Sequence, residues 1–485
     1  MKQKSRAVVN YIYSSFYQIF LIIVPLITAP YLARTLLPTA VGINSYVCSV
    51  VTIFTSLGLI GLNNYSLREI AYVRDDKKKL EKTFSELFFL RIICLIITSI
   101  IYIIYAFLSE YKIYFLIQLI AVLAVFIDIA WIYQGFEEFK VTVTRNFIVK
   151  ILNIISIFLF IKGPEDLLLF MIISSIYSVI VNLILYFGIK NKVGKITTKG
   201  INIKKHIIPT LKLFIPQVAS MVYLQCDKMM IKFLAEDISY VGFYDQAERI
   251  VKIPLALITA LSTVMLPRIA NEHKNNNKEV VKNHILSSFK FSLLMAIPLM
   301  LGVIAIAKNF IPWFLGKGYE EVIPIMMILS VIVLFISLSS VTGNQYLTAI
   351  NKTKVLTIAT LSGAIINTII NLLLIPKYNA IGAAIGTVIT ELIVFAIEIY
   401  HTKEIIKLKD LIKCSKNYLI SGIVMFTITF LVGHYTEPRI ISTIIQILTG
   451  GLTYFIVLYI LKDTFFIDCL NKLLSLLKIN KTIKE

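Results

Sequence analysis

The chain has 485 residues, of which 58% are hydrophobic and only 16% are charged, and its mean hydropathy is +0.82. Average soluble domains contain about 45 to 50% apolar and about 25% charged residues, so this composition excludes a water-soluble fold. The apolar residues suffice for up to ~14 membrane-spanning helices of about 20 residues each. The net charge of +20 must therefore be interpreted against a membrane before nucleic acid is considered.

Long apolar segments follow one another along the whole chain. Their unbroken length and their lack of strict alternation favour helices over the strands of a membrane barrel. We therefore predict an all-α polytopic membrane protein with about fourteen transmembrane helices. A window of about 19 residues places these spans at residues 10–33, 41–63, 84–108, 113–136, 146–161, 166–189, 208–234, 241–267, 285–307, 322–349, 355–375, 379–401, 415–433 and 440–461.

Basic residues concentrate in alternate loops. If the N-terminus is cytoplasmic, the segments expected inside hold most of the 48 Lys and Arg residues, including a basic linker at 190–207. The seven loops expected outside hold only Arg34, Lys112, Lys162, Lys308, Lys317, Lys377 and Arg439. This distribution follows the positive-inside rule and predicts a multi-pass protein of the bacterial plasma (inner) membrane with both termini cytoplasmic. The positive charge then reflects topology and attraction to anionic lipids, and no nucleic acid partner is expected.

Two short motifs recur between the halves of the chain at an offset near 200 residues. The sequence Val-Gly-Ile at 41–43 returns as Val-Gly-Phe at 241–243, and 67–71 returns loosely at 266–270. Both pairs fall at the ends of the second helix of a half, as expected for a parallel six-plus-six repeat. The predicted parts are a lobe of six helices at 1–195, a second lobe of six helices at 196–401, and two further helices with a basic cytoplasmic tail at 402–485.

Two carboxylates lie inside predicted spans, Asp128 in the fourth and Glu391 in the twelfth. A charge at the bilayer centre costs at least ~2.5 to 3.5 kcal/mol, so both are candidates for coupling or gating. The alternative for each is an internal pair or a protonated carboxyl bonded to a neighbouring helix. For Asp128, burial would suit proton coupling, whereas a nearby cation such as Arg91 would suit a conformational latch.

The eighth span carries four charges, Asp245, Glu248, Arg249 and Lys252, at spacings of three, four and seven residues that place them on one helix face. The two i,i+4 pairs can neutralise each other at a wet helix end. Alternatively, this stripe forms the wall of a transport lumen, in which Asp245 and Glu248 take part in gating or coupling.

Other cations extend the candidate substrate-binding set. Arg34 lies at the outer end of the first span, Arg91 about two turns into the third, and Lys228 in the seventh. Together with Arg249 and Lys252 they suit an anionic cargo, although Arg34 and Lys228 could instead extend to the lipid headgroups.

Motifs for enzymatic or metal chemistry are missing from the sequence. There is no G-x-x-x-x-G-K-[ST] for direct use of ATP, no H-E-x-x-H and no G-x-S-x-G. The five cysteines form no C-x-x-C pair, and the five histidines fall at predicted loops or helix ends, where they are expected to be solvated. We expect no enzyme, no cofactor and no metal.

Several motifs resemble a known family. They are the run from Pro30 to Ile43 with 67–71, the element Asp-Ile-Ala-Trp-Ile-Tyr-Gln-Gly-Phe-Glu-Glu-Phe at 128–139, and 241–250 with Leu-Pro-Arg at 266–268. They resemble Wzx-type flippases of bacterial polysaccharide repeat units, such as those for O-antigen or capsule, in the multidrug/oligosaccharidyl-lipid/polysaccharide exporter superfamily. The sequence departs from that pattern at Leu36-Leu37-Pro38, where the family pattern has leucine, glycine and proline.

The resemblance implies a function. It implies two lobes that open alternately to each side and move an undecaprenyl-diphosphate-linked oligosaccharide from the cytoplasmic to the outer leaflet. Exchange with a proton or sodium gradient is expected, because no nucleotide site is present. The alternatives are a multidrug or cation antiporter of the same superfamily and a membrane polysaccharide polymerase. The basic residues favour an anionic cargo over a drug cation, and the outward loops are short for a polymerase.

Overall fold

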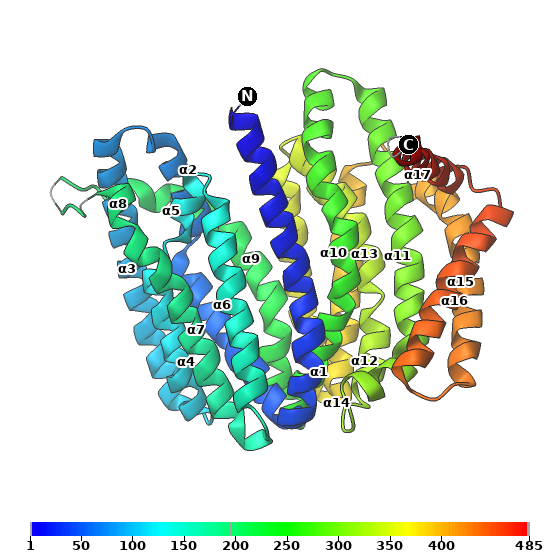
Figure 1. Cartoon of the computed structure of the whole chain (residues 1–485), viewed down its shortest axis with the longest axis horizontal. Helices are drawn as coiled ribbons and strands as arrows, with labels where there is room; N and C mark the ends of the chain where they lie inside the picture. The colour runs from blue at the N-terminus through cyan, green and yellow to red at the C-terminus, as the bar shows by residue number, and fades with distance from the viewer. Residues whose placement is uncertain (1, 195, 199, 407, 483–485) are drawn as a thin grey trace. The chain divides into compact units, whose positions relative to one another are not determined.

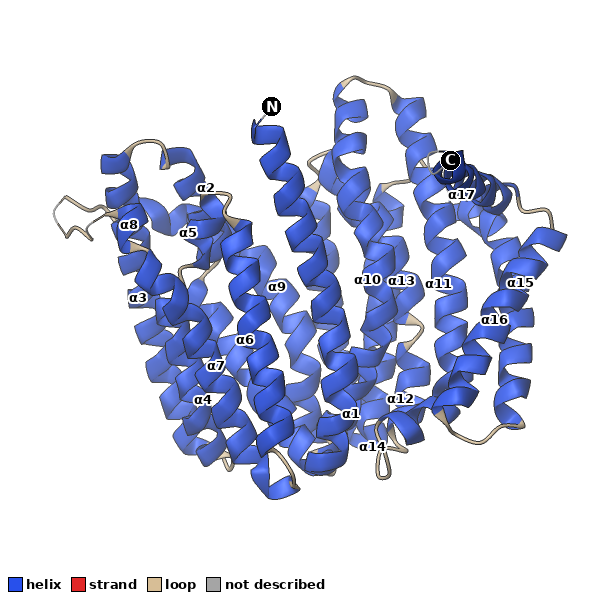
Figure 2. Ribbon diagram, viewed as in Figure 1, coloured by secondary structure: helices blue, strands red, loops and turns tan. Residues whose placement is uncertain are grey.

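The computed structural model describes residues 2–482 except 195, 199 and 407. Over this part of the chain every regular element is a helix, and no strand occurs (Figures 1 and 2). Ten helices among these residues are long and apolar enough to cross a membrane. The prediction of an all-helical membrane protein is confirmed.

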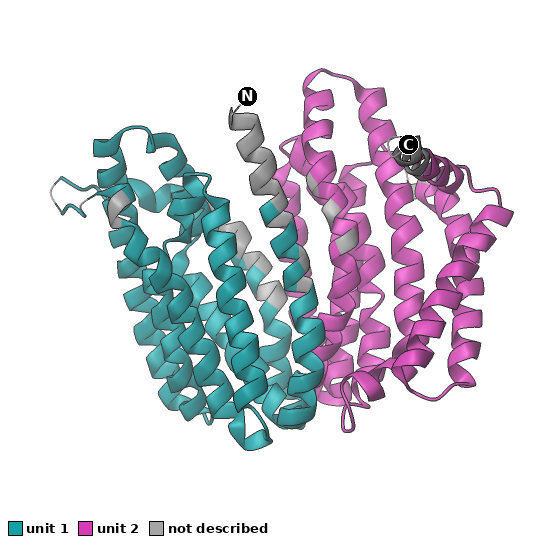
Figure 3. Ribbon diagram, viewed as in Figure 1, with its two compact units in different colours: residues 1–242 teal, residues 243–485 magenta. Residues whose placement is uncertain are grey.

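Contacts divide the chain into two compact units, residues 1–242 and 243–485 (Figure 3). The helices of unit 1 are α1 (Lys2–Leu59), α2 (Leu62–Val73), α3 (Lys77–Leu108), α4 (Lys112–Ala124), η1 (Val125–Ile127), α5 (Ala130–Gly135), α6 (Phe139–Phe160), η2 (Pro164–Asp166), α7 (Leu167–Gly188), α8 (Lys190–Val193), α9 (Lys204–Leu234) and the start of α10 (Ser239–Lys274). The predicted lobe division at residue 195, in the basic linker between the sixth and seventh predicted spans, stays a prediction.

Unit 2 continues α10 and adds α11 (Lys278–Phe314), α12 (Val322–Leu329), α13 (Ile332–Ser339), the π-helical segment η3 (Ser340–Leu347), α14 (Thr353–His401), α15 (Leu408–His434), α16 (Ile440–Ile460) and α17 (Thr464–Thr482). The two C-terminal spans α15 and α16 pack against each other and against α11 (Figure 1). One bond across this group joins the Tyr454 hydroxyl on α16 to the Leu294 carbonyl on α11 at 3.0 Å.

Two of the long helices each contain a break that divides them into two spans. In α1 the break lies at Leu37, with φ 64° and ψ 166°, directly before Pro38. In α14 it lies at Asn379, with φ 51° and ψ −133°. These positions agree with the predicted boundaries between spans 1 and 2 and between spans 11 and 12.

The glycines of the recurring Val-Gly motif meet at one helix crossing within residues 1–242. A Cβ atom on Gly42 would collide with the backbone of Ile238, and one on Gly242 would lie 2.9 Å from the backbone nitrogen of Gly42 and from the carbonyl oxygen of Pro38. Only glycine permits this approach of α1 to the start of α10.

Large apolar side chains cover the outer faces of both units. On α3, Ile93, Ile97, Ile100 and Ile104 are all exposed, and their spacing of about 3.6 residues places them along one stripe. In water such a patch would be costly, whereas in a bilayer it contacts lipid. The buried faces carry the polar side chains considered below.

Candidate substrate and coupling site

The charged stripe of α10 forms both ion pairs that its spacing permits. Arg249 Nε lies 2.7 Å from Asp245 Oδ2, and Lys252 Nζ lies 2.5 Å from Glu248 Oε1. The burial is asymmetric, because the carboxylates lie inward whereas the side chains of Arg249 and Lys252 are 51% and 40% exposed. The cationic ends of the stripe are therefore accessible to a ligand.

A further acidic residue, Asp237, lies two positions before the start of α10. Asp237 Oδ1 accepts a hydrogen bond from the Ser239 backbone N–H at 2.7 Å. Hydrogen bonds from the Ser239 side chain and backbone hold the pKa of the Asp237 carboxyl below its usual range. The ionised carboxylate stabilises the N-terminus of α10, where the helix dipole is positive.

Asp128 lies at a break between two helices. The predicted fourth span at 113–136 agrees with a candidate membrane span at Lys112–Gly135, but its helix is interrupted. Helix α4 ends at Ala124, η1 covers 125–127, and Asp128 itself has extended backbone angles before α5 begins. Asp128 Oδ1 accepts the Ala130 N–H at 3.0 Å and so caps the restarted chain. Hydropathy could not reveal this break, because the flanking residues are uniformly apolar.

The other oxygen of Asp128 pairs with Arg91. Arg91 Nη2 lies 3.3 Å from Asp128 Oδ2, and the Arg91 side chain is 2% exposed. The guanidinium also donates to Asn63 Oδ1 at 2.9 Å and to the Val125 carbonyl at 3.3 Å. Arg91 thus joins α2, α3 and the break at Asp128. This geometry corresponds to the latch alternative, and contact of Arg91 with cargo stays a prediction.

Arg34, Lys228 and Glu391, the other predicted site residues, lie on three different helices. Arg34 is exposed in the last turn of α1 before the break, and Lys228 is half-buried on α9. Glu391 is buried on α14. Their roles in binding or coupling stay predictions.

The sequence analysis missed a second carboxylate on α14. Glu398 is buried and accepts a hydrogen bond from Thr342 Oγ1 on the π-helical segment η3 at 2.5 Å. Next to it, Ser262 on α10 hydrogen-bonds Ser340 Oγ at 2.5 Å and accepts from Gln345 Nε2 at 3.0 Å. Glu391 and Glu398 are seven residues apart, so their shared helix face was a usable signal. Single-turn π segments inside helices often mark functional positions.

The prediction that His206 is exposed to solvent is wrong. Rather than being solvated, it is buried between Tyr65 and Glu86: its Nδ1 lies 2.8 Å from the tyrosine hydroxyl and its Nε2 lies 3.0 Å from a glutamate oxygen. Glu86 is fully buried and also contacts Lys205 Nζ at 2.7 Å and accepts the Asn202 N–H at 2.8 Å. This cluster fixes the start of α9 to α3.

Two family models and several known proteins match parts of this sequence. A family model described as "Polysaccharide biosynthesis protein" matches residues 7–273, and one described as "MatE" matches residues 213–373. An Escherichia coli K12 relative named "Putative O-antigen transporter" is 25% identical over 397 residues, 79% of this chain and 94% of its own length. The "Lipid II flippase MurJ" of Thermosipho africanus is 30% identical over 217 residues, 43% of each chain.

A solved structure has the same fold. A lipid II flippase MurJ in an inward closed conformation superposes with a TM-score of 0.74 at 21% identity, over 94% of this chain and 98% of that one. This likeness confirms the prediction of about fourteen transmembrane helices. The fold and the candidate membrane spans define a polytopic membrane protein. Because the first family model matches more than half of the sequence, the chain belongs to the polysaccharide biosynthesis protein family.

Proposed function

We propose that the chain is a flippase that moves a lipid-linked oligosaccharide from the cytoplasmic to the outer leaflet for polysaccharide biosynthesis. The family membership, the Escherichia coli relative named for O-antigen transport and the likeness to a lipid II flippase support this proposal. Because these relatives are named as transporters and flippases, the proposed activity is movement of a substrate and not an enzymatic reaction.

One observation carries the proposal: Arg249 and Lys252 lie exposed on a helix of a strongly apolar protein. Each cation pairs with a carboxylate of its own helix, but about half of each cationic side chain stays exposed. Exposed charge on a membrane helix is costly unless it faces an aqueous cavity or an anionic cargo. The cargo in this proposal is an oligosaccharide on undecaprenyl diphosphate, and its diphosphate would meet these two side chains. Arg249 offers the planar fork that suits phosphate oxygens.

The energy source in this proposal is an ion gradient. Each charge that crosses the membrane yields about 2.3 kcal/mol per 100 mV, and the sequence has no nucleotide-binding loop. In this proposal the buried carboxylates Glu391 and Glu398 couple a proton or sodium ion to alternating access, and Asp128 paired with Arg91 acts as a conformational latch. The proposed location is the bacterial plasma membrane with both termini cytoplasmic, supported by the loop distribution of basic residues.

Deletion of the gene from its native cells tests this function. Surface polysaccharide should disappear while lipid-linked oligosaccharide accumulates in the membrane, and expression of the intact chain should reverse both effects. Normal surface polysaccharide in the deletion strain, with no accumulated intermediate, would exclude the proposed function.

The multidrug or cation antiporter is the second candidate, favoured by the MatE match at residues 213–373. A multidrug resistance MATE family transporter also shares the fold, with a TM-score of 0.63 at 13% identity. Expression in drug-sensitive cells separates the two functions. An antiporter would raise resistance to lipophilic cations, whereas a flippase should leave resistance unchanged.

A further inference from the structure

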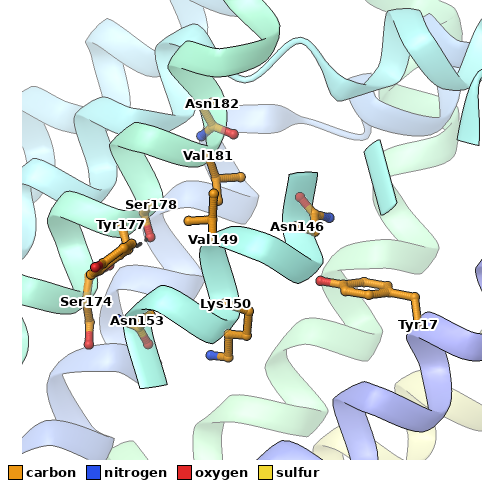
Figure 4. A pocket seen from close by; sticks show the side chains of 10 residues that line it. All are labelled: Tyr17, Asn146, Val149, Lys150, Asn153, Ser174, Tyr177, Ser178, Val181 and Asn182. Carbon is orange, nitrogen blue, oxygen red and sulfur yellow. Dashed lines mark hydrogen bonds between the residues drawn. The ribbon is translucent and has the colours of Figure 1, made fainter. Parts of the chain in front are cut away.

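Unit 1 contains a cavity of about 440 Å³ that no prediction from the sequence included. It lies among α1, α6 and α7 (Figure 4). Its volume is within the ~300 to 1,000 Å³ of small-molecule sites. The lining side chains are mostly amides and hydroxyls: Tyr17, Asn146, Val149, Lys150, Asn153, Ser174, Tyr177, Ser178, Val181 and Asn182.

The cavity is built by two polar helix faces. On α6, Asn146, Lys150 and Asn153 follow a helical spacing of four and three residues and line the cavity. The opposite face carries Leu152 and Ile155, which are exposed as expected for lipid contact. Helix α7 repeats this arrangement, with serine, tyrosine and asparagine toward the cavity and exposed isoleucines on the other side. A polar helix face inside the membrane is costly. Two such faces on either side of one cavity therefore indicate that the cavity holds water or a ligand.

Asn153 is the most informative residue of this cavity. It lies fourteen residues after the start of α6, ~21 Å along the helix at 1.5 Å per residue. The residue is 6% exposed, and its Nδ2 atom has no hydrogen-bond partner in the protein. A buried amide donor without a partner costs about 1 to 3 kcal/mol. A ligand in the cavity would supply the missing acceptor.

Neighbouring side chains are held in place by the protein itself. The Tyr177 hydroxyl hydrogen-bonds Ser156 Oγ at 2.8 Å, and Asn182 Nδ2 donates to the Ala124 carbonyl at 2.8 Å. Beside the cavity, Arg145 Nη1 donates to the Val181 carbonyl at 2.7 Å and fixes α6 to α7. The cavity walls are therefore preorganised.

We infer that this cavity binds a sugar residue of the lipid-linked cargo. Amides and hydroxyls supply donors and acceptors together, as sugar hydroxyl groups require, and Tyr17 and Tyr177 add apolar ring faces. None of the ten lining residues is a carboxylate, so the cavity is poorly suited to a cation. This inference rests on the proposed flippase function and assigns the sugar end of the cargo to α1, α6 and α7 of unit 1.

The test compares two probes on the purified full chain in nanodiscs: lipid-linked oligosaccharide extracted from the native cells, and undecaprenyl diphosphate without sugar. The test variants are Asn153→Leu, which replaces the unpartnered amide by an apolar group with the same branching, and Ser174→Ala. Because Asn153 Nδ2 bonds to no protein group, Asn153→Leu should fold normally. The matched control is Leu152→Ala, one position away on the lipid-facing side of α6.

The expected result is selective. Asn153→Leu should weaken binding of the sugar-bearing probe at least tenfold and leave undecaprenyl diphosphate binding unchanged, while Leu152→Ala should alter neither. Ser174→Ala should shift the sugar-bearing probe in the same direction. Equal affinities of both variants and the wild type for the sugar-bearing probe would overturn the inference alone. Failure of the wild type to bind either probe would overturn the proposed function, and this inference with it.

Discussion

Leu37 is held in a backbone conformation that favours glycine. Its φ of 64° and ψ of 166° are needed to break α1 between two spans, and Pro38 follows directly. Non-glycine residues in such regions cost about 1 to 3 kcal/mol.

Replacing this residue should therefore stabilise the protein. Leu37→Gly should raise the free energy of unfolding by about 1 kcal/mol, because relief of strain exceeds the added chain entropy of glycine. Little packing is lost, since Leu37 is 46% exposed. Thermal unfolding in detergent measures the change. Leu36→Gly is the control and should destabilise, because Leu36 is buried within the helix. A lower unfolding temperature for Leu37→Gly would contradict the strain.

The second prediction concerns the contribution of the Arg91–Asp128 pair to stability. Asp128→Asn keeps an acceptor for the Ala130 N–H but leaves the buried Arg91 without its counter-charge. The cost should be about 2 to 3 kcal/mol, below that of a fully buried pair, because the Asp128 side chain is 28% exposed. Adding Arg91→Gln should cost less than the sum of the single changes. Strictly additive losses in stability would show that the two residues do not act as a pair.

Part of this residue-level picture was predictable. The ion pairs on α10 follow from helical spacing alone, and pairing of Asp128 with Arg91 is one of the two alternatives that the sequence leaves open. The helix break at Asp128 and the burial of His206 were not predictable, because both depend on tertiary neighbours. The pairing of His206 with Glu86 joins residues 120 positions apart, and no local pattern encodes it.

At the scale of elements, the crossing of α1 with the start of α10 depends on Gly42 and Gly242. Gly242→Ala should destabilise the protein by about 1 to 3 kcal/mol, because its Cβ would meet backbone atoms that cannot move freely. Gly451→Ala on α16 is the matched control, since a Cβ there contacts nothing within 4 Å. Unfolding in detergent compares the two variants. Equal stability of both would mean that the crossing can relax.

The cations of the stripe on α10 are expected to be needed for export of polysaccharide. Arg249→Ala and Lys252→Ala should each lower export of polysaccharide at least severalfold without lowering the amount of protein in the membrane. The side chains are about half exposed, so their ion pairs contribute little to stability. Arg249→Lys should be milder than Ala, although it loses the bidentate fork. Normal export by both Ala variants would make the stripe structural only.

The order of the spans was predictable because each needs about 20 apolar residues. The sixth helix of the structure was not well predicted: α6 covers 139–160, whereas hydropathy indicated 146–161. Lys140 and Arg145 lower the average hydropathy of the first two turns of α6, so the window left these turns out. The face that Asn146, Lys150 and Asn153 share is invisible to a sliding average. The polar cavity was missed for the same reason.

At the scale of the whole molecule, each of the two units carries its own set of polar and charged groups. Unit 1 carries the polar cavity and the pair of Arg91 and Asp128, and unit 2 carries the cationic stripe and the carboxylates of α14. The composition predicted a membrane protein with its charge in the loops. It could not indicate these groups, because each depends on how helix faces meet.

Transport of lipid-linked oligosaccharide between leaflets is the central claim, and purified chain in liposomes tests it most directly. Lipid-linked oligosaccharide from the native cells is placed in both leaflets, and periodate, which does not cross the membrane, oxidises the sugars exposed outside. With an imposed proton or sodium gradient, the wild type should bring the inner pool out for oxidation, and the double variant Arg249→Ala with Lys252→Ala should be much slower. An inner pool that stays as protected as in protein-free liposomes, under either gradient, would contradict the account.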